Sequence, residues 1–419
     1  MMETISYLKR KTVPQICKHV TETKLEPIIA ETPDYQAREH LMGAFIGKSS
    51  GPTLIVIGSL HGNEPGGAMA LSNVSQQLGE MTDELKGRVY FLRGNTRALA
   101  EGVRFVDADL NRHWTPKNMS NIGTEALYDS SEGVELTELD RILDGILITA
   151  MDEVFVLDLH STSADGIPYA TVGDTLRNRT FAQKFPVTIL LGIEEQLDGT
   201  MLEYLNNAGA VTLGFEGGQH LSPETVRNHE ALVWLALVNT KLLSEADVPD
   251  SELCRWRLDA GSRGSRLFEV RHRHAISAQD EFEMIPGFKN FNPVRQGEIL
   301  AHDRNGPVRA LESGLLLMPL YQKLGSDGFF IGRQISPFWL RLSGILRRIG
   351  IQKVIHILPG VRRDKNVPGT LIVDTSVARL FPLQVFHLLG FRRRRWIKNK
   401  LVVSRRKHDT DAPFKWKGV

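Results

Sequence analysis

Two residues with metal-binding side chains, His61 and Glu64, follow an apolar run in the stretch IVIGSLHGNEPGGAMAL, which spans Ile55–Leu71. The glycines around them allow a tight turn and leave room for a ligand. His160 ends a second apolar run, in VLDLHSTS. Two imidazoles and one carboxylate are a ligand set typical of catalytic zinc, with one position open for water or substrate. The sequence therefore predicts one Zn²⁺ per chain, although side-chain type alone leaves manganese or cobalt open.

Spacing alone does not establish this metal site. A second His-x-x-Glu pair, His19 and Glu22, follows no apolar run and is interpreted as a chance match. Taken singly, His160 also reads as a hydrogen-bonded core histidine and Glu64 as a charge at a helix N-terminus. The metal hypothesis depends on their shared position after apolar runs.

A candidate general base, Glu216, follows a further apolar run in LGFEGGQH and precedes two glycines. A carboxylate there can take a proton from the attacking water and pass it to a leaving nitrogen. Arg104, Asn111 and Arg112 lie in VRFVDADLNRHW, between two apolar runs. One arginine near a metal can stabilise an oxyanion, and a second, beside an asparagine, can bind a substrate carboxylate.

The elements that position these residues are short apolar strands separated by amphipathic stretches. We predict strands at 53–59, 88–95, 154–160, 187–192 and 210–216, and helices at 66–79, 132–150 and 222–243. This alternation indicates an α/β fold, a mainly parallel sheet with helices on both faces. Ligands of such folds gather at the carboxyl ends of the strands, and the predicted ligands and base follow such ends.

The rest of the chain differs in pattern. Residues 1–254 are predicted to form the α/β domain, and 255–333, with short alternating runs and many turn residues, a small β-rich domain. Residues 334–419 are predicted to be a basic α+β extension. It opens with an amphipathic helix that ends near Pro359 and Gly360, followed by a βαββ-like unit with a helix over roughly 376–389.

The C-terminal extension differs from the rest of the chain in net charge. Residues 334–419 hold 19 Lys and Arg against 4 Asp and Glu, whereas residues 1–333 hold 32 against 45. The run FRRRRWIKNKLVVSRRK has the composition of a phosphate-binding patch. The favoured interpretation is docking on the acidic body or on a neighbouring subunit, or a hairpin whose arginines simply face water; nucleic acid or an anionic membrane surface is the alternative.

Composition indicates the compartment. The two cysteines, Cys17 and Cys254, form no CxxC pair, and no run approaches the roughly 18 apolar residues of a membrane span. The N-terminus lacks the apolar run of a signal peptide. A cytoplasmic protein is expected.

Four blocks in this order, HGNEPGG, RFVDADLNR, DLHSTS and GFEGGQ, resemble the succinylglutamate desuccinylase/aspartoacylase family of zinc hydrolases, which is related to the zinc carboxypeptidases. The resemblance covers roughly residues 40–333. It implies His61, Glu64 and His160 as zinc ligands, Glu216 as general base, and Arg104 as the arginine that polarises the carbonyl. It also implies Asn111 and Arg112 as residues that hold the substrate carboxylate. The small β-rich domain is similar to the one that covers the active-site mouth in this family.

One further residue belongs to this prediction, and two positions depart from it. Asp158, two residues before His160, is expected to orient that histidine, because metal-bound histidines usually contact a carboxylate. Aspartoacylase has an arginine ten residues before the base glutamate, where this chain has Asn206. Its substrate-pocket tyrosine has no clear match, with Phe329 or Phe330 nearby.

The leading functional hypothesis is hydrolysis of a small N-acylated amino acid. A metallocarboxypeptidase that trims a peptide C-terminus would use the same metal apparatus. A non-catalytic binding protein acting through its basic extension is the third alternative, and the intact ligands and base argue against it.

Overall fold

The computed structural model describes residues 39–413, apart from residues 263–265, 323, 366, 368, 375–382 and 398–399. Cys17 and the His19–Glu22 pair lie outside the described residues. Within the described part of the chain, no helix combines the length and the apolar character needed to cross a bilayer.

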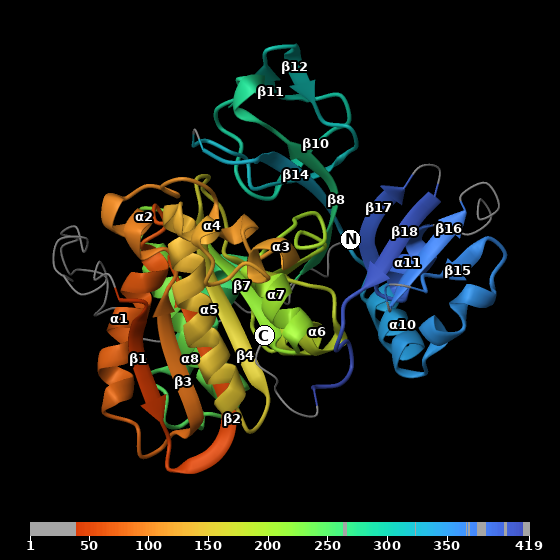
Figure 1. Cartoon of the computed structure of the whole chain (residues 1–419). Helices are drawn as coiled ribbons and strands as arrows, with labels where there is room; N and C mark the ends of the chain where they lie inside the picture. The colour runs from red at the N-terminus through yellow and green to blue at the C-terminus, as the bar shows by residue number, and fades with distance from the viewer. Residues whose placement is uncertain are drawn as a thin grey trace, which may run out of the picture. The chain divides into compact units, whose positions relative to one another are not determined.

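An eleven-stranded sheet forms the centre of the described fold (Figure 1). Its strands are, in spatial order, β1 (Leu41–Ile46), β3 (Lys86–Arg93), β2 (Ser49–Gly58), β4 (Val154–Thr162), β7 (Val211–Gln219), β5 (Tyr169–Val172), β6 (Thr188–Leu191), β8 (Leu267–Ala275), β14 (Asp327–Gln334), β13 (Gly314–Leu317) and β10 (Asn292–Val294). Strands β3, β2, β4 and β7 run parallel. The predicted α/β fold with parallel strands at the centre of a large sheet is confirmed, while β1, β5 and the edge from β8 to β10 add antiparallel pairs.

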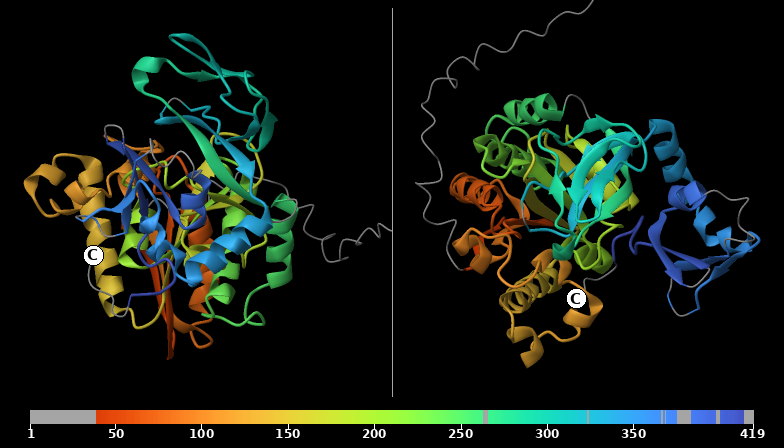
Figure 2. Two further views of the ribbon diagram at one scale, coloured as in Figure 1. Left: turned by 90° about the vertical axis from the view of Figure 1, so that its right-hand side faces the viewer. Right: turned by 90° about the horizontal axis from the view of Figure 1, so that it is seen from above.

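Helices cover both faces of this sheet, as the two views of Figure 2 also show. One face packs against α1 (Gly66–Gly79), α6 (Leu176–Ala182), α8 (Pro223–Asn239) and α9 (Ser251–Ser262), and the other against α5 (Ser131–Thr149) and α7 (Met201–Ala208). Side chains of β2 alternate between the two faces of the sheet, so they contribute to two cores. Leu54 and Val56 face the first group of helices, and Ile55 and Ile57 face the second. A strand buried on both faces needs apolar residues at every position, which explains the unbroken run.

The predicted boundary at residue 254 falls inside a helix. Helix α9 continues to Ser262 and packs against α8 in the core of the large domain, so residues 255–262 are helical rather than β-rich. Strands β8 and β14 then extend the central sheet itself. A separate sheet of β9 (Glu283–Met284), β11 (Ile299–Asp303) and β12 (Gly306–Arg309) completes the β-rich part.

The C-terminal extension, from residue 334 onward, differs in detail from the prediction. Helix α10 (Pro337–Arg348) ends about ten residues earlier than predicted, because Gly350 takes a left-handed conformation with φ of 82°. A four-stranded antiparallel sheet follows, in the order β15 (Val361–Arg363), β16 (Thr370–Asp374), β18 (Lys400–Arg405) and β17 (Phe391–Ile397). The predicted helix at 376–389 is described only as α11 (Leu383–Leu388), and its first part lies outside the described residues.

Candidate active site

The candidate ligands and base are brought together by the register of three neighbouring parallel strands. In β4 and β7, His160 stands directly opposite Glu216. Strand β2 pairs with the other edge of β4, and Gly58 at its end stands opposite Leu159. The chain leaving β2 therefore reaches His61 beside His160 after a three-residue step. Parallel strands deliver their carboxyl ends to one edge, as the sequence predicted.

Glycine is needed after β2 because the backbone packs closely there, as well as because the chain makes a tight turn. A Cβ atom on Gly62 would lie 2.0 Å from the carbonyl carbon of Ala98 in α2 (Thr96–Glu101), so no other residue fits there. Ser59 takes a left-handed conformation with φ of 60°, which is rare outside glycine. Its Oγ donates to the backbone oxygen of Glu64 at 3.0 Å and so closes the turn.

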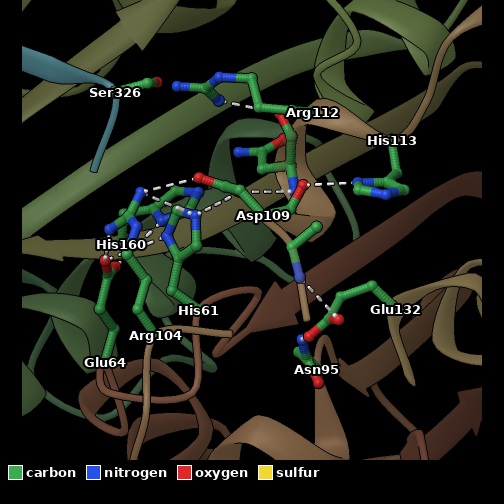
Figure 3. Close-up of polar contacts among 12 residues, drawn as sticks. His61, Glu64, Asn95, Arg104, Asp109, Arg112, His113, Glu132, His160 and Ser326 are labelled. Atoms are coloured by element: carbon green, nitrogen blue, oxygen red, sulfur yellow. Dashed lines mark hydrogen bonds and ion pairs between the residues drawn. The ribbon is translucent and has the colours of Figure 1, made fainter. Parts of the chain in front are cut away.

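His61, Glu64 and His160 form a candidate metal site (Figure 3). One ligand atom from each lies within 4.8 Å of the others. The Nδ1 atoms of His61 and His160 lie 3.1 and 3.0 Å from the two carboxylate oxygens of Glu64. Although burial opposes ionisation, His61 and His160 hold the pKa of Glu64 well below its usual value, so its side chain is ionised, the form that can bind a metal.

The opposite nitrogens of both imidazoles are held by carboxylates. His160 Nε2 lies 2.7 Å from Asp158 Oδ2, and His61 Nε2 lies 3.0 Å from Asp109 Oδ1. Each contact leaves Nδ1 of the ring directed at Glu64, so Nδ1 is the nitrogen that each histidine would offer to a metal. The residues therefore fit a divalent ion with nitrogen and oxygen ligands.

Asp109 was missed in the sequence, although it lies inside the quoted block RFVDADLNR. Besides His61, its side chain accepts from the backbone N–H of Asn111 at 2.9 Å and from Arg104 Nη2 at 3.3 Å. Glu132, from the start of α5, was missed as well. It accepts backbone N–H groups of residues 106–108, which positions the loop that carries Asp109 (Figure 3).

Arg104 lies against the candidate ligands. Its guanidinium contacts Glu64 Oε1 at 3.3 Å and Asp109 Oδ2 at 3.3 Å. Its Nε–H is buried and has no hydrogen-bond partner within the described residues. A buried unpaired donor beside a metal site is available to a substrate carbonyl oxygen.

The two residues predicted to hold a substrate carboxylate have protein partners. Arg112 Nη2 donates to Asp327 of β14 at 3.0 Å, while its buried Nε–H lacks a partner in the described structure. The side-chain oxygen of Asn111 accepts the backbone N–H of Met201 at 3.0 Å and so holds the first residue of α7. Both residues line the cavity described next, and their contact with substrate stays a prediction.

One cavity of about 130 Å³ joins the candidate metal site to the candidate base. His61, Glu64, His160, Arg104 and Glu216 all line it. Burial raises the pKa of Glu216 to about 8, and its Oε2 has no hydrogen-bond partner among the described residues. A buried carboxylate with a free oxygen beside a metal site is suited to carry a proton.

The residues at the two positions that depart from the family pattern lie in different surroundings. Phe330 lines the cavity, whereas Phe329 packs in the core of the small β-rich part. Asn206 is fully buried, donates to the backbone oxygen of Ala210 at 2.9 Å, and is not among the cavity-lining residues. Its side-chain oxygen instead lies 3.5 Å from Nη1 of Arg406, an arginine of the C-terminal extension.

Replacing Asp158 by asparagine tests the support of His160. We expect Asp158→Asn to lower the affinity for Zn²⁺ by about 10- to 100-fold, because the imidazole loses the anion that orients it and raises its basicity. Competition with a chromogenic chelator measures this. Asp165→Asn, at an exposed carboxylate paired with Lys289, is the control and should leave affinity unchanged. Equal affinities for both variants would contradict the assignment.

Comparisons with known proteins show which family the chain is similar to. The model of the succinylglutamate desuccinylase/aspartoacylase catalytic domain matches residues 50–241. A succinylglutamate desuccinylase of Pseudomonas fluorescens (strain Pf0-1) is 30% identical over 271 residues, which cover 61% of this chain and 74% of that protein. A crystal structure of a succinylglutamate desuccinylase/aspartoacylase from Rhodobacter sphaeroides has a TM-score of 0.53 at 19% identity. This match covers 71% of this chain and 88% of the other protein's chain, and so shows a shared fold.

Other relatives match over shorter segments. An aspartoacylase of Danio rerio is 34% identical over 113 residues, which are 26% of this chain and 34% of that protein. A succinylglutamate desuccinylase of Pseudomonas fluorescens (strain SBW25) is 31% identical over 94 residues, 22% of this chain and 27% of that protein. The matched part of the chain thus spans about a quarter to a third of these two relatives.

Proposed function

Because the chain belongs to the succinylglutamate desuccinylase/aspartoacylase family, we propose that it hydrolyses the amide bond of an N-acyl amino acid or a similar small acylated amine, with Zn²⁺ as cofactor. The observation that carries the proposal is the free carboxylate oxygen of Glu216 in the same cavity as His61, Glu64 and His160. Relatives named as succinylglutamate desuccinylase and aspartoacylase support the amide as the bond that is cleaved.

The roles of the chain's own residues follow from their contacts. His61, Glu64 and His160 would hold the metal, which as a Lewis acid would activate water and polarise the acyl carbonyl. Glu216 takes a proton from the attacking water and later delivers it to the departing amine. The Nε–H of Arg104 is available to the carbonyl oxygen as negative charge develops on it. Asp158 and Asp109 keep the two imidazoles in place.

Metal removal and a substrate panel test the proposal. We expect purified protein to release free amine from N-acyl amino acids, to lose this activity after dialysis against a chelator, and to regain it with Zn²⁺. Amine release is measured with a fluorogenic amine reagent, and bound metal by elemental analysis. Short peptides form the second arm of the panel. Cleavage of the peptides but not of the N-acyl amino acids would replace the deacylase by the carboxypeptidase.

A further inference from the structure

A buried arginine of the C-terminal extension lies behind one wall of the cavity. Arg406 directly follows β18, and its side chain is 9% exposed. Its Nη2 donates to Glu194 Oε2 at 3.0 Å, and its Nε donates to Glu195 Oε1 at 3.2 Å. Although burial favours the neutral form, these two carboxylates raise the pKa of Arg406 above its usual value. The guanidinium is therefore a fixed cation in this buried cluster.

Gly173 leaves room for Arg406 and Glu194 because it has no side chain. A Cβ atom on Gly173 would lie 2.5 Å from Cζ of Arg406 and 2.8 Å from Oε2 of Glu194. The extension is also anchored nearby. Buried Arg347 of α10 binds Asp174 Oδ2 at 3.0 Å, and Asp409 Oδ1 accepts the backbone N–H of Leu176 at 2.8 Å. The position of Arg406 is thus determined by the fold of the extension.

Glu194 differs from its neighbour in facing the cavity. It lines the same cavity as the candidate metal ligands, whereas Glu195 is not among the lining residues. Glu194 is 4% exposed, and its Oε1 is buried without a hydrogen-bond partner in the described part of the chain. A buried carboxylate oxygen left unpaired costs free energy, which a ligand with a hydrogen-bond donor recovers.

The charge around Glu194 selects a cationic donor. Two carboxylates, those of Glu194 and Glu195, contact the guanidinium of Arg406, so these three described side chains together carry an excess of negative charge. Burial, and then the charges of Glu195 and Glu203, raise the pKa of Glu194 to about 7, while Arg406 lowers it. A further cation at Oε1 would offset the repulsion among these carboxylates.

We propose that Glu194, positioned by Arg406, is a specificity-determining residue whose free oxygen binds a cationic nitrogen on the part of the substrate away from the cleaved amide. The inference rests on the proposed deacylase function and narrows it to acylated amines that carry a second, positively charged amine. It also gives the C-terminal extension an indirect role in substrate binding, because Arg406 contacts the cavity-lining Glu194 from outside the cavity.

A panel of substrates matched in size tests this directly. The metal-loaded, full-length protein is assayed with the Nα-acetyl derivatives of ornithine, glutamine and glutamate, whose side chains are cationic, neutral and anionic. We expect the highest kcat/KM for the cationic member. Glu194→Gln should lower kcat/KM for that member by more than about 10-fold, mainly through KM, and change the neutral member less than about 3-fold.

The neighbouring glutamate provides a matched control. Glu195→Gln removes the same charge and also loses a contact with Arg406, but at a residue outside the cavity lining. It should therefore change all three substrates by a similar, small factor. Arg406→Gln should reproduce the pattern of Glu194→Gln, with partial recovery in Arg406→Lys, while Arg362→Gln, at an exposed arginine of the same extension, should match the wild type. Melting temperature and metal content verify folding.

The outcomes separate the two proposals. Hydrolysis of the panel with no preference for the cation, or an equal effect of Glu194→Gln on all three members, overturns the role of Glu194 and leaves the deacylase intact. If the wild type hydrolyses no N-acyl amino acid, the deacylase fails. Glu194 is then tested by the thermal shift that ornithine and glutamate produce in wild type and Glu194→Gln: a shift specific to ornithine and to wild type supports the subsite, and its absence overturns it.

Discussion

Glu216→Gln is expected to retain its metal and lose turnover. The amide matches the carboxyl group in size but cannot accept a proton, so kcat should fall by about 10²- to 10⁴-fold, the usual contribution of general acid–base catalysis. Glu216→Asp keeps the carboxylate at a shorter reach and should retain more activity than the glutamine variant. Steady-state kinetics together with elemental analysis measures both, and normal turnover in Glu216→Gln would remove the base assignment.

The stability of the same variant distinguishes a lost base from a damaged fold. Burial raises the pKa of Glu216 from 4.5 to about 8, so in metal-free protein the folded state holds a proton that the unfolded state releases between these pH values. The contribution of this group to the free energy of unfolding therefore decreases as pH rises through that window. Glu216→Gln cannot ionise, so relative to wild type its melting temperature should rise with pH over the same window.

His160→Ala should lose the metal itself. Removal of one imidazole leaves His61 and Glu64 as ligands, and we expect metal affinity to fall by more than about 100-fold, beyond the effect of losing a supporting contact. Bound zinc should drop from about one per chain to near zero after dialysis, and amine release should vanish with it. Elemental analysis of the dialysed protein gives the answer.

A second cavity histidine is the matched control for this loss. His220 lines the same cavity, and its Nδ1 lies 2.8 Å from Ser161 Oγ, but it is not part of the three-residue ligand set. His220→Ala should therefore keep its zinc. Zinc retained by His160→Ala, or lost equally from both variants, would show that the ligand set is wrong.

The sequence predicted that His61, Glu64 and His160 would lie together, as they do in the structure, because each one is marked locally. His61, His160 and Glu216 each follow a run of apolar residues that is long enough for a strand and too short for a helix. Helix α1, predicted at 66–79, begins and ends at those residues. The end of α10 was harder to predict, because a left-handed Gly350 leaves no periodicity signal ahead of it.

By itself, the sequence determined which side chains end strands and which chemical groups they carry. Tertiary structure decided what lies beside them: that His160 stands opposite Glu216 in β4 and β7, and that Asp109 supports His61. It also decided that Arg406, 212 residues away along the chain, contacts Glu194. The physical reason is that hydrophobic periodicity is a local property, whereas strand order and the pairing of buried charges depend on how the whole chain packs.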